Sequence, residues 1–72
     1  MTPEEFDNTG FGGNMYAMHG GERKFVVTAS FPERLLGLLP EKPEGEFDAW
    51  DIEWVRCENV TEIIRPQLIQ FT

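Results

Sequence analysis

Apolar and polar residues alternate with a period of two through several short stretches of the chain, a pattern typical of strands with one buried face. Segments rich in glycine, proline and acidic residues separate these stretches. The pattern predicts strands at about residues 14–19, 23–31, 35–39, 50–57 and 60–65. Short strands joined mostly by short turns indicate a mainly β, antiparallel fold.

A short helix is expected before the first strand, at about residues 3–8. Thr2 can serve as its N-cap, Pro3 suits the first helical position, and Glu5 stands where the second partner of a capping box is required. Asn8 and the glycines that follow should end this helix after one or two turns.

The first two strands should form a hairpin that turns at Gly20-Gly21, because glycine takes positive φ angles without steric cost. Strict alternation in the second strand predicts that one face is buried. The residues on that face are Phe25, Val27, Ala29 and Phe31.

Two later strands carry features that need an interpretation. Gly37 should mark a bulge or bend in strand 35–39. In strand 50–57, Trp50, Ile52 and Trp54 share a face that is predicted to join the core, with Asp51 and Glu53 on the opposite face. The alternative is that one tryptophan is a partly exposed anchor for a partner, since interfaces favour tryptophan.

The end of the folded part resembles the close of an SH3-like barrel. A tryptophan-bearing strand is followed by Glu58-Asn59-Val60-Thr61-Glu62, which is similar to the turn that joins the last two strands in that family. The resemblance covers residues 50–64 best, and it implies a single 3₁₀ turn between the last two strands. It implies the barrel and not peptide binding, because Tyr16 is the only tyrosine and the tyrosine-rich first loop of the family is absent.

The whole chain also resembles small proteins carried by bacterial phages and mobile elements, which have no known activity. The resemblance rests on Glu4–Gly12, on the hairpin, and on Trp54–Val60. The length of 72 residues leaves room for one domain, so we expect a single domain, residues 1–72. We expect an SH3-like barrel or rolled sheet of four to five short strands with a short N-terminal helix.

Composition argues against an enzyme and against a bound cofactor. The chain has one cysteine, Cys57, and one histidine, His19, so we expect no internal disulfide and no closed metal site. Asp51 and Glu53 lie two residues apart on one strand, but a chain this short hardly encloses a glycosidase cleft. The acidic N-terminal segment and the lone thiol favour a cytoplasmic protein.

Thirteen acidic residues against six basic ones give a net charge of −7, which disfavours direct binding to nucleic acid or to a membrane. Residues 41–53 hold six of the acids, a run that either keeps the protein soluble or faces a partner. We expect a non-enzymatic protein–protein interaction module. The alternative is a decoy that mimics nucleic acid and inhibits a basic nucleic-acid-binding protein. The candidate partner-binding residues are Glu41, Glu44, Glu46, Asp48, Asp51, Glu53, Trp50 and Trp54.

The final segment, residues 67–72, is too apolar for a solvated terminus. Leu68, Ile69 and Phe71 could form a homodimer, which would add apolar burial to a small domain. The alternative is that the segment folds back and covers an open edge of its own sheet.

Overall fold

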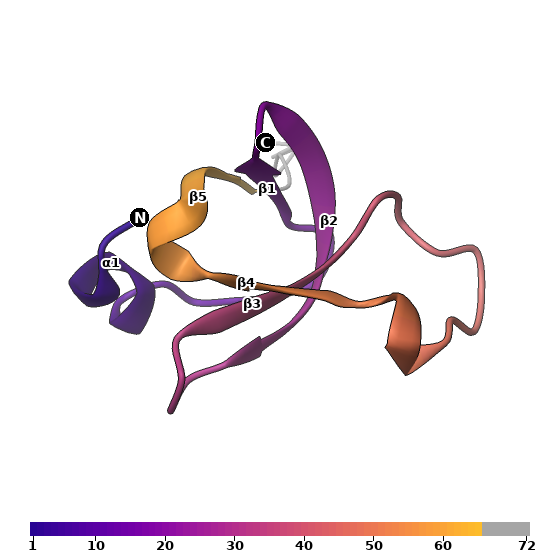
Figure 1. Cartoon of the computed structure of the whole chain (residues 1–72), viewed down its shortest axis with the longest axis horizontal. Coiled ribbons are helices and arrows are strands. Elements are labelled where there is room, and N and C mark those ends of the chain that lie inside the picture. The colour runs from indigo at the N-terminus through magenta and orange to yellow at the C-terminus, as the bar shows by residue number, and fades with distance from the viewer. Residues whose placement is uncertain (66–72) are drawn as a thin grey trace, which may run out of the picture.

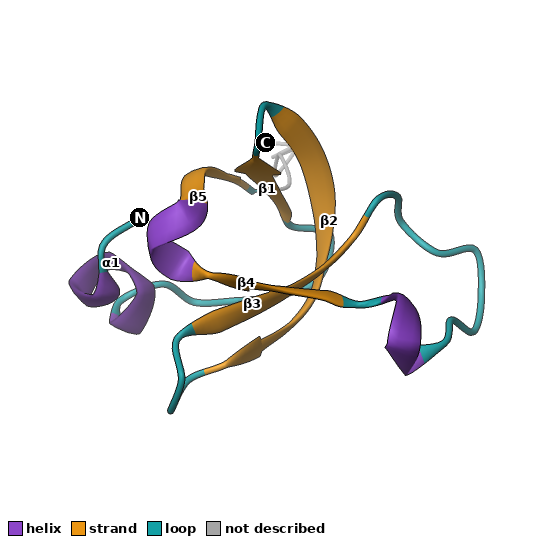
Figure 2. Cartoon of the chain, in the orientation of Figure 1, coloured by secondary structure: helices purple, strands orange, loops and turns teal. Residues whose placement is uncertain are grey.

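The computed structural model of the chain describes residues 1–65, which form one sheet and one short helix (Figures 1 and 2). None of the helices in this part of the chain is long and apolar enough to cross a bilayer. In chain order the elements are α1 (Pro3–Asp7), β1 (Tyr16–His19), β2 (Glu22–Ser30), β3 (Leu35–Leu39), the 3₁₀ turn η1 (Ala49–Asp51), β4 (Glu53–Arg56), the 3₁₀ turn η2 (Cys57–Asn59) and β5 (Val60–Ile64).

The five strands make a single antiparallel sheet with the order β4-β3-β2-β1-β5. The sheet is not closed, since β4 and β5 are its two edges. The long strand β2 curves strongly and carries the sheet around the core (Figure 1). The mainly β, antiparallel fold expected from the sequence is therefore confirmed, in the form of an open, rolled sheet. A 3₁₀ turn, η2, joins β4 and β5 at the position that the sequence predicts.

The β1–β2 hairpin turns at Gly20 and Gly21, as predicted. Their φ angles are 61° and 79°, and the flanking residues His19 and Glu22 are directly paired. Two consecutive positive φ angles are the signature of the two-residue turn whose twist matches that of the strands. This turn fixes the register of the hairpin.

Helix α1 begins with the predicted capping box. The Thr2 hydroxyl accepts from the backbone N–H of Glu5, and the Glu5 carboxylate accepts from the backbone N–H of Thr2. The helix packs beside η2 and directs Phe6, which is fully buried, into the core. A five-residue helix is too short to be stable alone, so it depends on its capping and on its contacts with the rest of the fold, among which Phe6 is the buried one.

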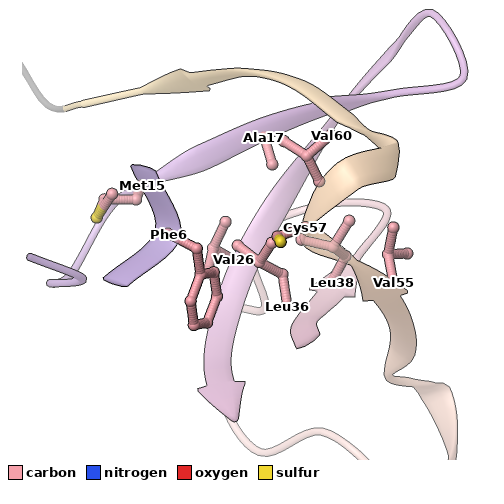
Figure 3. Close-up of a cluster of buried hydrophobic side chains, with 9 residues drawn as sticks. All are labelled: Phe6, Met15, Ala17, Val26, Leu36, Leu38, Val55, Cys57 and Val60. Carbon is pink, nitrogen blue, oxygen red and sulfur yellow. The ribbon is translucent and has the colours of Figure 1, made fainter. Parts of the chain in front are cut away.

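The core lies on the inner face of the roll, and every element except η1 contributes to it or adjoins it (Figure 3). Aliphatic and sulfur-containing side chains and one phenylalanine, Phe6, fill it rather than tryptophans. The buried cluster consists of Phe6, Met15, Ala17, Val26, Leu36, Leu38, Val55, Cys57 and Val60. Cys57 is thus a buried free thiol that packs as an apolar residue.

The predicted buried face of the second strand is wrong for Phe25, Val27 and Phe31, whereas Ala29 packs against the core. Val26 is buried, whereas Phe25 and Val27 are half-buried and Phe31 is 52% exposed beyond the end of β2. The reason is a bulge between Val26 and Thr28, which breaks the period of two in the middle of the strand. The extra residue lies in β2, and the residues on either side of it pair with Leu38 and Gly37, so Gly37 does mark a bulge, although the bulged strand is its neighbour.

The predicted strand at residues 50–57 is shorter, and its buried face is the opposite one. Trp50 lies in η1, β4 begins only at Glu53, and Val55 is buried instead of the tryptophans. Asp48 ends the extended conformation here, because its side chain accepts from the backbone N–H of Trp50 and starts the 3₁₀ turn. The pairing of Val55 with Leu36 then sets which face of β4 points inward.

The predicted homodimer contacts Leu68, Ile69 and Phe71 lie outside the described residues.

Candidate interaction surface

The loop between β3 and β4 reaches away from the sheet (Figure 1). We call residues 40–52 the acidic loop. Its carboxylates are all exposed, and Lys42, the one basic residue among them, donates through Nζ to Asn14 Oδ1 at 2.6 Å. The acidic loop therefore presents a concentrated negative charge to solvent. The predicted site residues that it brings together are Glu41, Glu44, Glu46, Asp48, Asp51 and Trp50.

Trp50 is 92% exposed although its backbone is held by η1. Asp48 Oδ1 accepts from its N–H at 3.0 Å, and the N–H of Asp51 donates to the Asp48 carbonyl at 2.9 Å. An exposed indole on a fixed backbone offers a large contact area at little cost in conformational entropy. Two carboxylates flank it in sequence.

The carboxylate of Glu53, unlike those of the acidic loop, is paired with a basic side chain. Its Oε1 accepts from Lys24 Nζ at 2.9 Å and lies 3.5 Å from His19 Nδ1. The hydrogen bond from Lys24 lowers the pKa of the Glu53 carboxyl, so the charge is kept and is balanced by the ammonium. The structure thus separates Glu53 from the other predicted site residues.

Trp54 is half-exposed on the outer face of the sheet, where it is paired with Gly37. Its ring and the side chains of Thr28 and Ile52 fill the space that a Cβ on Gly37 would need. This packing ties the base of the acidic loop to β3 through Ile52. Trp54 therefore combines a structural contact with a free face.

The groups that could carry chemistry are not brought together. His19 is paired with Glu22 at the start of β2, whereas Ser30 is the last residue of that strand. Burial and hydrogen bonding to Glu58 raise the pKa of the Cys57 thiol, which keeps it protonated. Among residues 1–65, no three His, Cys, Asp or Glu side chains are grouped to hold a metal ion.

A set of exposed phenylalanines was not predicted from the hydrophobic pattern. Phe31 and Phe47 are about half-exposed, and they line a groove of about 460 Å³ with Phe11 and Phe25. Phe11 and Phe31 also pack on Phe6, with ring centroids 5.1 and 5.4 Å away. The six phenylalanines in 72 residues were the available indication, since so small a core cannot enclose them all.

Comparison with protein-family models, with curated proteins and with solved structures finds no match to this chain.

Proposed function

We propose that this protein is a non-enzymatic interaction module that binds a protein partner through Trp50 and the acidic loop. The observation that carries the proposal is the almost complete exposure of Trp50 on a backbone fixed by Asp48. Tryptophan is enriched among the residues that dominate binding energy at interfaces. The surrounding carboxylates would steer the approach of a partner whose surface is basic.

The state of the reactive groups supports a non-enzymatic role. The thiol of Cys57 is buried and protonated, and His19 Nδ1 lies 3.2 Å from the ammonium of Lys24. Neither arrangement activates a nucleophile, which needs an adjacent base or a lowered pKa. A buried free thiol also suits a reducing compartment, and we propose the cytoplasm on that ground.

The nucleic-acid-mimicking decoy is the second candidate. It is favoured by the five exposed carboxylates between Glu41 and Asp51, which are offset in the acidic loop only by Lys42. Such a surface could occupy the basic groove of a nucleic-acid-binding protein. The resemblance to proteins of phages and mobile elements is compatible with either candidate and stays a proposal.

The two candidates differ in which side chains binding depends on. The full chain is used to capture proteins from a host lysate, beside Trp50→Ala and a triple variant in which Glu41, Glu44 and Glu46 become glutamine. If the protein is an interaction module, Trp50→Ala should weaken the binding of at least one captured protein by about 30-fold. This is the effect on affinity of removing a side chain that contributes about 2 kcal/mol to binding. The melting temperature should not change, because Trp50 makes little contact with the fold.

Glu33→Gln is the matched control, since it removes one exposed charge outside the acidic loop. A decoy would instead lose its partner with the triple variant and keep it with Trp50→Ala, and duplex nucleic acid would compete for that partner. If every captured protein is recovered equally with all the variants, both proposals are wrong.

A further inference from the structure

Strand β2 has an open edge in its second half. It pairs with β3 as far as Ser30, but its pairing with β1 ends at Phe25, followed only by the hydrogen bond from Val26 N to Met15 O. Within residues 1–65, no backbone hydrogen bond continues this ladder along residues 27–30. An unpaired edge of this kind is a template for a further strand.

The groove lined by Phe11, Phe25, Phe31 and Phe47, which we call the aromatic groove, runs beside this edge. Its lining combines the β2 residues 25–29 with the loop residues Phe11, Gly12 and Gly13, and with Phe31 and Phe47. Gly12 and Gly13 line the groove with backbone and carry no side chains. The site therefore combines free backbone groups with an apolar pocket, the two elements that a docked extended segment requires.

The described chain ends next to the same groove. Ile64 pairs with Tyr16, and Arg65 Nη1 donates to the carbonyl of Gly10 at 3.2 Å. Gly10 directly precedes Phe11 in the groove wall. The seven residues that follow Arg65 can span up to about 23 Å when extended, enough to enter the groove from this point.

We propose that residues 67–72 of the same chain dock in the aromatic groove as an extended segment along the open edge of β2. In an extended segment Ile69 and Phe71 share one side, which would face the aromatic side chains, while Gln70 points away. Docking within one chain is favoured over capture of another molecule because the short connection gives a high effective concentration. This inference is independent of the proposed function, since it involves neither Trp50 nor the loop carboxylates.

Amide hydrogen exchange on the full chain tests the inference. Docking should protect amides within residues 27–31 that have no partner in residues 1–65. The variant Ile69→Asp/Phe71→Asp should speed their exchange at least tenfold. Gln70→Asp/Thr72→Asp is the matched control, because it adds the same two charges to the same segment on the side opposite Ile69 and Phe71, and it should leave the protection in place. The β1–β2 ladder amides report any change in overall stability.

Two results overturn the inference. The first is exchange of residues 27–31 that is fast in the unaltered chain, or that responds equally to both variants. The second is protection that rises with protein concentration together with a doubled mass in sedimentation. That outcome would mean that the segment docks on a second copy, as in the homodimer expected through Leu68, Ile69 and Phe71.

Discussion

At the scale of single residues, Gly37 decides how the outer face of the sheet packs. It is buried in the middle of β3, and the position of a Cβ there would be 2.6 Å from Thr28 Cγ2 and 2.9 Å from Ile52 Cγ2. Real Cβ atoms do not approach other carbons so closely. Because Gly37 has no side chain, the side chains of Thr28 in β2, Trp54 in β4 and Ile52 at the end of the acidic loop can pack directly on its backbone.

Replacement of Gly37 by alanine should therefore destabilise the protein by about 1–3 kcal/mol, as expected when a packed site is overfilled. Gly45→Ala is the control, since nothing lies within 4 Å of its Cβ position. That change should alter the free energy of unfolding by less than about 1 kcal/mol. Urea unfolding of both variants measures the difference, and equal midpoints would show that Gly37 has no packing role.

The tryptophans show what sequence reasoning could not decide at this scale. Residues 50–57 contain two alternating faces, one with Trp50, Ile52 and Trp54 and one with Val55 and Cys57. Size alone favoured the first face. The outcome depends on Gly37, which leaves room for Trp54 outside the sheet, and on the Asp48 cap, neither of which periodicity records.

At the scale of elements, α1 is fastened to the sheet by an ion pair as well as by Phe6. Arg34 in the β2–β3 turn donates from Nε and Nη2 to both carboxylate oxygens of Asp7, at 3.0 and 2.8 Å. The hydrogen bonds from Arg34 lower the pKa of the Asp7 carboxyl. The folded protein therefore keeps this group ionised at a pH where the unfolded chain binds a proton.

The sign of the pH dependence follows from that lowered pKa. The contribution of Asp7 is fully present above its ordinary pKa of about 3.9 and is lost as pH falls through the lower, folded value. Asp7→Asn should reduce the stability at neutral pH and flatten the acid limb of the curve. Glu33→Gln, which removes the same charge beside Arg34, should leave the acid limb unchanged. Thermal melts between pH 2 and pH 7 test this prediction. If stability falls with pH equally steeply in Asp7→Asn and in the unaltered chain, the prediction is wrong.

Features that depend on neighbouring residues were predictable, whereas the bulge in β2, which depends on tertiary structure, was not. Thr2 and Glu5 predict α1, and Gly20-Gly21 predicts the hairpin turn, because capping and turn geometry depend on residues close in sequence. The bulge in β2 has no such local mark. It arises where one strand must pair with β1 at one end and β3 at the other in a curved sheet.

At the scale of the whole molecule, the ends of the roll carry different chemistry. At the end where β2 finishes, the rings of Phe6, Phe11 and Phe31 contact one another. At the end where β2 begins, Lys24 reaches Glu53 of β4. The two edge strands, β4 and β5, are not paired with each other, so no closed ladder fixes the curvature of the sheet. The curvature is therefore set by the core and by the contacts at the two ends of the strands.

The candidate site was predictable in its charge but not in its shape. The run of carboxylates is visible in the sequence, and it lies in a loop because proline and glycine interrupt the alternation there. The sequence does not show that Glu53 is set apart from that surface by its pairing with Lys24. The two residues are 29 positions apart, and only the curl of the sheet brings them together. The aromatic groove is hidden for the same reason.

The pair Lys24–Glu53 should therefore couple the hairpin to the edge strand β4. Lys24 is only 18% exposed and Glu53 is 53% exposed, so the pair is partly shielded from solvent. A double-mutant cycle with Lys24→Met and Glu53→Gln should give a coupling between about 0.2 and 1 kcal/mol that falls in high salt. Arg56 and Glu58, neighbours in sequence with side chains 73% and 42% exposed, form the control pair, whose coupling should be smaller. If the Lys24–Glu53 cycle gives no more coupling than the control, this contact does not hold the roll, and its curvature comes from the core and the β2 bulge alone.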